Sequence, residues 1–510
     1  MELTKLTQQE LAAGLKSISS ELRGVFDSWD FKNYVLGGLF FKFLSEKIIK
    51  HVAVTYRINF IDFPDKDAEN LKSSIVAKIG YFIPPSELFI NVYRQDQISI
   101  IMSNVFQHIE DSVQGTEFED RFSGIFNDCD PLSNKIGVDI ATRNLRISKL
   151  LKAISSIKVD FNAIDSDILG DAYEVLISMY AENAGRSGGE FFTPIEVSEL
   201  LTQLGIVNMS IPKSVYDPSC GSGSLLLSSI KVIKEKIQNN ATLPPIDFYG
   251  QEINPMTYNL CRMNMILHNI DLDRFHIACG NTLSDPKFWD NKFDLIVSNP
   301  PYSVHWAGDS DPAMLTDPRF APVGVLAPKS KGDFAFVLHC LYHLAKTGTA
   351  AIVCFPGILY RIKSEQKIRK YLIDNNFVDA VIQLPENLFF GTSITTCILI
   401  LKKNRSSKNI LFMDASNECN KLTHKFVLEK KHINKIVDSY AYWRNQEHFS
   451  RIVSISKVIE QDFNLSVNTY VQKPNALETL DINALNTEID LIVNREQQLR
   501  DEIERIINGL

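Results

Sequence analysis

The stretch SVYDPSCGSGS, residues 214–224, decides the fold class of this chain. Residues 214–216 include Val215 and Tyr216, which favour a short strand. The glycines that follow favour a tight turn. From Ser224 to residue 237, apolar side chains recur at helical spacing. A strand, a glycine turn and a helix in this order are typical of an α/β sheet. The glycines either only close the turn or let the backbone approach a ligand.

The same alternation continues on both sides of this stretch. Further strands are predicted at 246–250, 293–298, 350–355, 378–384 and 395–401, and further helices at 194–205, 255–269 and 333–345. Strands that alternate with helices favour βαβ units, so we expect an α/β, Rossmann-like fold with a mostly parallel sheet. The later strands are closer together, which predicts an antiparallel hairpin near residues 395–413.

The two ends of the chain differ from this pattern. Residues 1–165 show helical spacing and no strand-like alternation, which predicts an all-α domain. Beyond residue 475, apolar residues at three- and four-residue spacing predict an amphipathic helix. That helix either packs on its own protein or docks on a partner chain. We therefore predict three parts: residues 1–165, a catalytic domain at 166–472, and a C-terminal helix at 473–510.

Composition narrows the function classes. Hydrophobic residues make up 45% and charged residues 22%, as in globular proteins, and no apolar run approaches the roughly 20 residues that span a membrane. The N-terminus lacks the features of a signal peptide. The eight cysteines form no CxxC pair, so reduced thiols in the cytoplasm are expected instead of disulfides or a zinc site. The net charge is −8, and the two basic clusters, 329–331 and 361–370, are modest. Both observations argue against a chain that binds nucleic acid strongly without a partner.

A cofactor site is predicted where the second strand ends, at Gly250-Gln251-Glu252. An acidic residue at this place commonly binds ribose hydroxyls. Together with the glycine turn, Glu252 indicates a cofactor that carries a nucleoside.

Asn299-Pro300-Pro301-Tyr302 directly follows the predicted strand 293–298. The prolines end the strand and hold the backbone stiff. An exocyclic amine of a planar base is a poor nucleophile because its lone pair is delocalised into the ring. The Asn299 amide oxygen and the Pro300 carbonyl could accept its hydrogens and localise that pair, while Tyr302 offers a face for stacking. The alternative is a rigid turn without chemistry.

Position favours the chemical interpretation, since ligands of open parallel sheets bind at the carboxyl ends of the strands. The glycine turn, Glu252 and Asn299 all follow predicted strands. Two other features are expected to be structural: the His339 and His343 pair, which lacks the glutamate of a zinc-protease pattern, and the segments at 333–334 and 391–393. No pattern marks Cys220 as a nucleophile. No Pro-Cys nucleophile of a cytosine-C5 methyltransferase is present in a suitable loop.

Over nearly its whole length the chain resembles the modification subunit of type I restriction–modification systems. The resemblance is carried by Gly189 to Pro194, Asp217 to Ser224, Gly250 to Glu252, Gly280-Asn281-Thr282-Leu283 and Asn299 to Tyr302. It implies S-adenosylmethionine as methyl donor and a flipped adenine held by Asn299, Pro300, Pro301 and Tyr302. Asn281 stands where many methyltransferases have an acidic residue, and the order of the motifs is that of the gamma class. The residues expected around the cofactor are Glu190, Phe191, Phe192, Thr193, Pro194, Asp217, Ser219, Cys220, Gly221, Ser222, Gly223, Ser224, Glu252, Asn281 and Thr282.

The resemblance also implies partners. Such subunits act on DNA with a specificity subunit, a second copy of the modification subunit and a restriction motor-nuclease subunit. In such a complex an acidic chain can rely on a partner subunit for much of the DNA binding. Residues 464–471 and the last helix resemble the part that approaches the specificity subunit. Two rival functions stay open: a methyltransferase for another amide or amine, as in the glutamine methyltransferases of release factors, and a scaffold subunit without catalysis.

Overall fold

The structure is a computed structural model that describes residues 31–156, 193–237, 244–308, 311–389, 394–421, 426–472 and 482–508. The chain forms two compact units, Met1–Val471 and Gln472–Leu510. The predicted boundary at residue 165 and the first 30 residues of the predicted all-α domain lie outside the described residues, so the domain limits stay a prediction. None of the described helices is both long and apolar enough to cross a membrane.

The described part of the N-terminal region, residues 31–156, contains helices and no strands, as predicted. The central helix, α2 (Phe31–Tyr56), is apolar on several faces, which is typical of a helix surrounded by others. Its side chains Phe40 and Phe41 are fully buried. Around it lie α3 (Asp65–Glu69), α4 (Lys72–Ile79), α5 (Phe89–Val92), α6 (Ile98–Asp111), α7 (Glu119–Phe122) and α8 (Ile140–Ser156).

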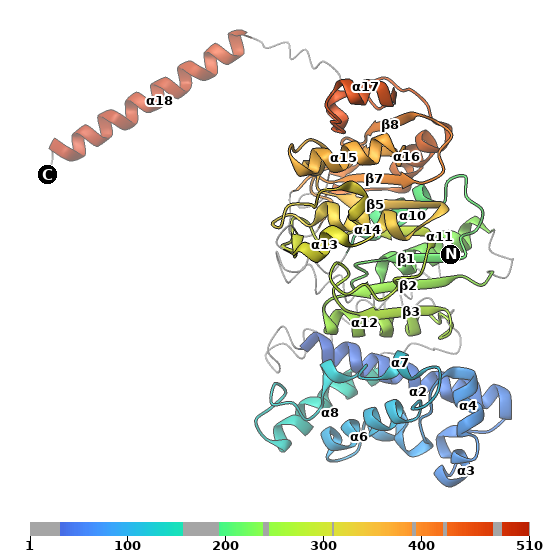
Figure 1. The fold of residues 1–510 in the computed structure, drawn as a ribbon. Helices are drawn as coiled ribbons and strands as arrows, with labels where there is room; N and C mark the ends of the chain where they lie inside the picture. The colour runs from blue at the N-terminus through green and yellow to red at the C-terminus, as the bar shows by residue number, and fades with distance from the viewer. Residues whose placement is uncertain are drawn as a thin grey trace. The chain divides into compact units, whose positions relative to one another are not determined.

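The main sheet of the α/β region has nine strands in the order β11-β8-β6-β7-β5-β4-β1-β2-β3 (Figure 1). A second, two-stranded sheet pairs β9 (Asn420–Lys421) with β10 (Phe426–Val427). The pairs from β3 to β5 are all parallel, which confirms the predicted Rossmann-like sheet. The strands are β1 (Ser214–Asp217), β2 (Asp247–Glu252), β3 (Phe275–Cys279), β4 (Phe293–Ser298), β5 (Leu344–Cys354), β6 (Val378–Gln383), β7 (Cys397–Lys402), β8 (Asn409–Asp414) and β11 (Ser450–Ser454).

The order of the strands reverses at β1. From β1 the chain proceeds outward to β2 and β3, then returns to place β4 on the other side of β1. This topological switch leaves a crevice beyond the carboxyl ends of β1 and β4, where open α/β sheets bind their ligands. The helices of this region are α10 (Ile195–Ile206), α11 (Ser224–Lys236), α12 (Pro255–Leu267), α13 (Pro312–Thr316), α14 (Asp333–His343), α15 (Ser364–Asp374), α16 (Lys430–Tyr442) and α17 (Ile455–Glu460).

The predicted hairpin near residues 395–413 is wrong. Strand β7 pairs antiparallel with β5 and β6, whereas β8 pairs parallel with β6, so β6 separates β7 from β8. The residues of β7 are almost all apolar and buried. A strand of this kind is most stable in the middle of a sheet, where both of its edges are paired.

The N-terminal helices cover the β3 edge of the sheet, as the blue helices beside β3 in Figure 1 show. Arg262 on α12 is 2% exposed, and its Nη1 donates to the carbonyls of Asp120 and Ser123, both at 2.9 Å. Arg121 Nε donates to the Leu272 carbonyl at 3.1 Å. These contacts shield the edge strand from pairing with other chains.

The second unit contains the predicted C-terminal helix, α18 (Ile482–Asn508). Among its described side chains, the apolar Ile489, Ile492, Leu499 and Ile503 are exposed. An amphipathic helix is thereby confirmed, and its docking on a partner stays a prediction.

Candidate active site

The glycine turn between β1 and α11 has the backbone that its sequence predicts. Gly221 and Gly223 have φ values of 54° and 87°, in the left-handed region that favours glycine. A Cβ atom on Gly223 would lie 2.9 Å from Cys261 Sγ, so a side chain is excluded there by space as well. The Cys220 N–H donates to the Gln251 carbonyl at 3.0 Å and fixes the turn against β2.

Glu252, at the end of β2, reaches back to this turn. One carboxylate oxygen accepts from the Gly221 N–H at 3.0 Å, and the other accepts from the Asn254 N–H at 2.8 Å. Burial raises the pKa of Glu252, and these backbone hydrogen bonds oppose the rise. The next side chain, Ile253, is 63% exposed although it is apolar. An oriented carboxylate and an apolar surface therefore stand side by side at this strand end.

Asp217 ends β1 and is completely buried. Its Oδ1 accepts from the Ser219 N–H at 3.0 Å, but its Oδ2 accepts no hydrogen bond from the residues that the structure describes. Burial, with a contribution from the charge of Glu252, raises the pKa of Asp217 to about 8. A buried acceptor without a donor is costly, and a ligand with an N–H group would satisfy it.

The segment after β3 closes the crevice. The Thr282 hydroxyl is buried and donates to the Pro218 carbonyl at 2.5 Å, so it holds the glycine turn. Asn281 is exposed, and its Oδ1 accepts from the Leu283 N–H at 3.0 Å. Its amide thus orders its own loop, while a contact with a cofactor stays a prediction.

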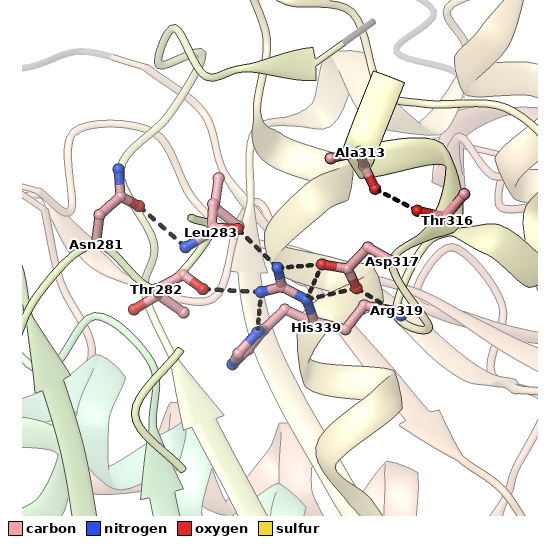
Figure 2. Close-up of polar contacts among 8 residues, drawn as sticks. All are labelled: Asn281, Thr282, Leu283, Ala313, Thr316, Asp317, Arg319 and His339. Atoms are coloured by element: carbon pink, nitrogen blue, oxygen red, sulfur yellow. Dashed lines mark hydrogen bonds and ion pairs between the residues drawn. The ribbon is translucent and has the colours of Figure 1, made fainter. Parts of the chain in front are cut away.

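Arg319 organises this segment, although no sequence pattern marked it. The residue is 4% exposed, and its guanidinium donates to the carbonyls of Thr282 at 2.8 Å and Leu283 at 2.7 Å. On its other side it pairs with Asp317 at 2.6 Å (Figure 2). It also meets His339 Nδ1 at 3.1 Å. Arg319 therefore joins the loop after β4 to the segment after β3.

The histidine pair is structural, as expected. His339 is fully buried, and its Nε2 lies 3.0 Å from the Tyr216 hydroxyl. Burial lowers the pKa of His339 well below its usual value, so the neutral ring can accept from Arg319. His343 Nδ1 meets the Asn291 carbonyl at 3.0 Å. In the part of the chain that is described, no cluster of His, Cys, Asp and Glu could hold a metal ion.

Replacing Arg319 with Met is expected to lower the free energy of unfolding by about 3–5 kcal/mol, because it removes the cation that pairs with the Asp317 carboxylate and the donor to two buried carbonyls. Denaturant unfolding would measure the loss. The control is Arg274→Met, whose ion pair with Asp247 lies at the surface, so its loss should have a much smaller effect. Equal effects of the two substitutions would contradict the role of Arg319.

Asn299 is held from both ends of its amide. Its Nδ2 donates to Thr193 Oγ1 at 3.0 Å, and its Oδ1 accepts from the Tyr302 hydroxyl at 2.6 Å. The neighbouring Ser298 Oγ lies 3.3 Å from Ser219 Oγ, which links the end of β4 to the glycine turn. The Asn299 amide is thus fixed in space next to the predicted cofactor crevice.

Tyr302 is half-buried and packs edge-to-face on Phe389, with ring centroids 6.4 Å apart and an interplanar angle of 88°. Burial raises the pKa of its hydroxyl well above the usual value, so the group remains a proton donor to Asn299. After Tyr302 the chain turns at Ser303, whose φ is 51° and whose N–H donates to Asp333 Oδ1 at 3.1 Å.

The structure brings most of the predicted site residues to one edge of the sheet. Thr193 lies against Asn299, and Pro194 precedes the first turn of α10. Cys220 Sγ is buried 3.9 Å from Cys261 Sγ, and Ser222 Oγ lies 3.3 Å from Ser224 Oγ. Glu190, Phe191, Phe192 and the segment 391–393 lie outside the described residues.

Comparison with known proteins identifies the family. Residues 164–479 match the family model described as N-6 DNA Methylase, and residues 11–154 match the HsdM N-terminal domain. The chain is 46% identical to the type I restriction enzyme MpnII methylase subunit of Mycoplasma pneumoniae, over 97% of this chain and 95% of that protein. It is 28% identical to the MjaVII methylase subunit of Methanocaldococcus jannaschii, over 99% of this chain and 85% of that one.

A solved structure agrees with these sequence relatives. The type I restriction-modification system methyltransferase subunit from Streptococcus thermophilus superposes with a TM-score of 0.82 at 34% identity, covering 91% of this chain and all of that one. Both the helical and the α/β parts fall within these matches. The chain therefore belongs to the N-6 DNA methylase family, among the type I restriction–modification methylase subunits, and is an S-adenosylmethionine-dependent, adenine-specific DNA methyltransferase.

Proposed function

We propose that Asn299 and the Pro300 carbonyl hold the amino group of a flipped adenine for methyl transfer to N6. The observation that carries this proposal is the Asn299 amide, which Thr193 and Tyr302 fix from both ends beside the glycine turn. A rigid turn without chemistry would not need an amide oriented in this way.

The crevice residues fit S-adenosylmethionine, which supplies a methyl group on a positively charged sulfur. The Glu252 carboxylate, already oriented by the Gly221 and Asn254 N–H groups, would accept from ribose hydroxyls. Ile253 offers its exposed apolar face to the adenine ring of the cofactor. Asp217 Oδ2, which accepts no hydrogen bond from the described residues, would accept from the amino group of the methionine part.

In the proposed mechanism the target adenine leaves the duplex at a cost of a few kcal/mol and stacks on Tyr302. Its N6 hydrogens point to Asn299 Oδ1 and the Pro300 carbonyl. The Asn299 oxygen has two lone pairs, of which Tyr302 occupies one, so the other is left for N6. Asn299 and the Pro300 carbonyl would hold the N6 lone pair toward the methyl group that S-adenosylmethionine would supply, and N6 would lose one proton to solvent. Positioning supplies most of the acceleration.

Thr193→Val is expected to slow methyl transfer about tenfold, since it removes one hydrogen bond that fixes the Asn299 amide. Single-turnover kinetics at saturating cofactor would measure the rate. Thr193→Ser, which keeps the hydroxyl, should restore it. A weaker affinity for S-adenosylmethionine with an unchanged rate would instead indicate that Thr193 acts on the cofactor.

Asp217 predicts a pH dependence of stability. Its pKa is about 8 when folded, against about 3.9 in an unfolded chain. Between these values the folded state holds a proton that the unfolded state lacks, so the stability that this group contributes falls as pH rises and is lost above about pH 8. Unfolding midpoints of the cofactor-free protein from about pH 5 to about pH 8 should therefore fall more steeply than those of Asp217→Asn. Parallel curves would contradict the assignment.

We propose that this chain does not select its site. With a net charge of −8, it would depend on a specificity subunit for sequence recognition and for much of its grip on DNA. A second copy of this chain and a motor-nuclease subunit would complete the restriction complex, and the exposed apolar side chains of α18 would dock on a partner subunit. Since DNA is the substrate, the complex would work in the cytoplasm.

The test is methyl transfer from tritium-labelled S-adenosylmethionine by the chain purified with the product of its neighbouring specificity gene. Label in DNA, dependent on the specificity subunit, is the expected result. Label in protein would support the rival glutamine methyltransferase. Cofactor binding without transfer to any substrate would support the scaffold interpretation.

A further inference from the structure

A groove of about 700 Å³ lies between two connections that leave the same edge of the sheet. One wall comes from residues 324–331, in the connection from β4 to α14, and the other from residues 361–365, which run from the connection after β5 into the first turn of α15. Strands β4 and β5 are parallel neighbours, so both connections begin at the edge where Asn299 lies. The groove therefore lies at the same edge of the sheet as the active site, where the carboxyl ends of the parallel strands meet.

Hydrogen bonds connect one wall of the groove to residues 304–306, which follow the catalytic tetrapeptide. The Gly332 N–H donates to the Val304 carbonyl at 2.9 Å, and the Trp306 N–H donates to the Lys329 carbonyl at 3.0 Å. The Trp306 indole N–H adds a bond to the Pro328 carbonyl at 3.1 Å. The segment that contains Lys331 thus runs alongside the residues that follow Tyr302.

The charged residues of the groove are mostly cationic. Lys331, Arg361 and Lys363 line it, together with a single acidic residue, Glu365. Glu365 is 3% exposed, and its Oε1 lies 3.4 Å from Arg361 Nη1. Its carboxylate therefore pairs with the Arg361 guanidinium. Within the described part of the chain, neither Lys331 nor Lys363 forms a salt bridge. Two lysines therefore keep their charges available to a ligand.

The groove is thus lined by part of each basic cluster recognised in the sequence: Lys331 from residues 329–331, and Arg361 and Lys363 from residues 361–370. The net charge of the chain is −8, so positive charge gathered at the edge of the sheet where Asn299 lies favours an anionic ligand there. Hydroxyl groups of Ser330 and Ser364 also line the groove and could donate to phosphate oxygens. Exposed apolar Leu315 and Ile362 at its border suit the sugars between phosphates.

We propose that this groove binds the sugar–phosphate backbone of the DNA strand that presents the target adenine, with Lys331 and Lys363 contacting phosphates. The inference rests on the proposed function and deepens it, because the catalytic chain then contributes part of the DNA grip itself. Contacts to the backbone on the strand of the flipped base would hold the extruded nucleotide in register with Asn299. Backbone contacts carry no sequence information, so site choice remains with the partner.

The test compares two double charge reversals in the complete complex with its specificity subunit. One is Lys331→Glu with Lys363→Glu in the groove. The control is Lys213→Glu with Lys346→Glu, which makes the same change of charge at exposed positions at the amino ends of β1 and β5, on the opposite edge of the sheet. Binding of sheared, unmodified genomic DNA is measured as a function of salt, followed by methyl transfer at varied DNA concentration.

The groove variant is expected to raise the apparent KM for DNA by about tenfold and to reduce the slope of log affinity against log salt by about 1.8, which corresponds to two phosphate contacts. The affinity for S-adenosylmethionine should stay at its wild-type value, which also shows that the variant is folded. The control pair should leave the salt slope nearly unchanged.

Equal salt slopes for the groove and control variants would overturn the proposal. So would weakened assembly with the specificity subunit at unchanged DNA affinity, since the groove would then be a docking surface for an acidic protein segment. If the wild-type complex binds DNA but transfers no methyl group, the proposed function fails. The measurement of DNA binding against salt still decides whether the groove holds DNA.

Discussion

Asn299→Ala is expected to lower the rate of methyl transfer by about a thousandfold while the affinity for S-adenosylmethionine stays at its wild-type value. The substitution removes the acceptor proposed for N6 and also the partner of Thr193 and Tyr302. Losing one preorganised polar group at a reacting centre typically costs about 10²–10³ in kcat. Single-turnover methylation and calorimetric titration of the cofactor would measure the two quantities separately.

Tyr302→Phe is the matched control for this substitution. It keeps the ring for stacking and removes only the hydroxyl that donates to Asn299, so the expected loss is about tenfold. A wild-type rate for Asn299→Ala would contradict the clamp. A loss of cofactor binding in that variant would instead place Asn299 in the cofactor site.

Glu252→Gln is expected to weaken S-adenosylmethionine binding by about a hundredfold, equivalent to about 3 kcal/mol, with little change in the rate at saturating cofactor. Both carboxylate oxygens now accept backbone N–H groups, from Gly221 and Asn254. A glutamine would turn its NH₂ group toward one of these donors, which disrupts the turn and removes an acceptor from the proposed ribose site.

Glu199→Gln provides the control for this charge change, since Glu199 is a half-buried glutamate on α10 whose hydrogen bond comes from the Gln203 side chain. It should leave cofactor affinity unchanged. Equal dissociation constants for wild type and Glu252→Gln would show that Glu252 only supports the turn.

The sequence predicted most of the parallel half of the sheet because β1, β2 and β4 are each followed by a helix with clear periodicity. The prediction failed where the periodicity was weak or the pairing was nonlocal. Strand β3 is short and half-buried, so it lacks a strong apolar pattern. The insertion of β7 between β5 and β6 depends on pairing with residues distant in the chain, and local spacing contains no information about it.

The active site could be anticipated to the extent that its residues belong to compact motifs. The glycine turn, Glu252 and Asn299 each follow a strand, so the topology brings them together. Arg319 could not be anticipated, because its role depends on burial and on carbonyl groups from another loop. The hydrogen bond from Asn299 to Thr193 was equally hidden, since it joins residues far apart in the sequence.

Asn299 to Tyr302 are proposed to hold adenine in DNA for methyl transfer to N6. The most direct test of this claim is nucleoside analysis of unmodified DNA after incubation with labelled S-adenosylmethionine and the complete complex. The expected result is label in N6-methyl-2′-deoxyadenosine alone, formed by the wild-type chain and absent with Asn299→Ala. Label in a methylated cytosine, or undiminished label with Asn299→Ala, would contradict the claim.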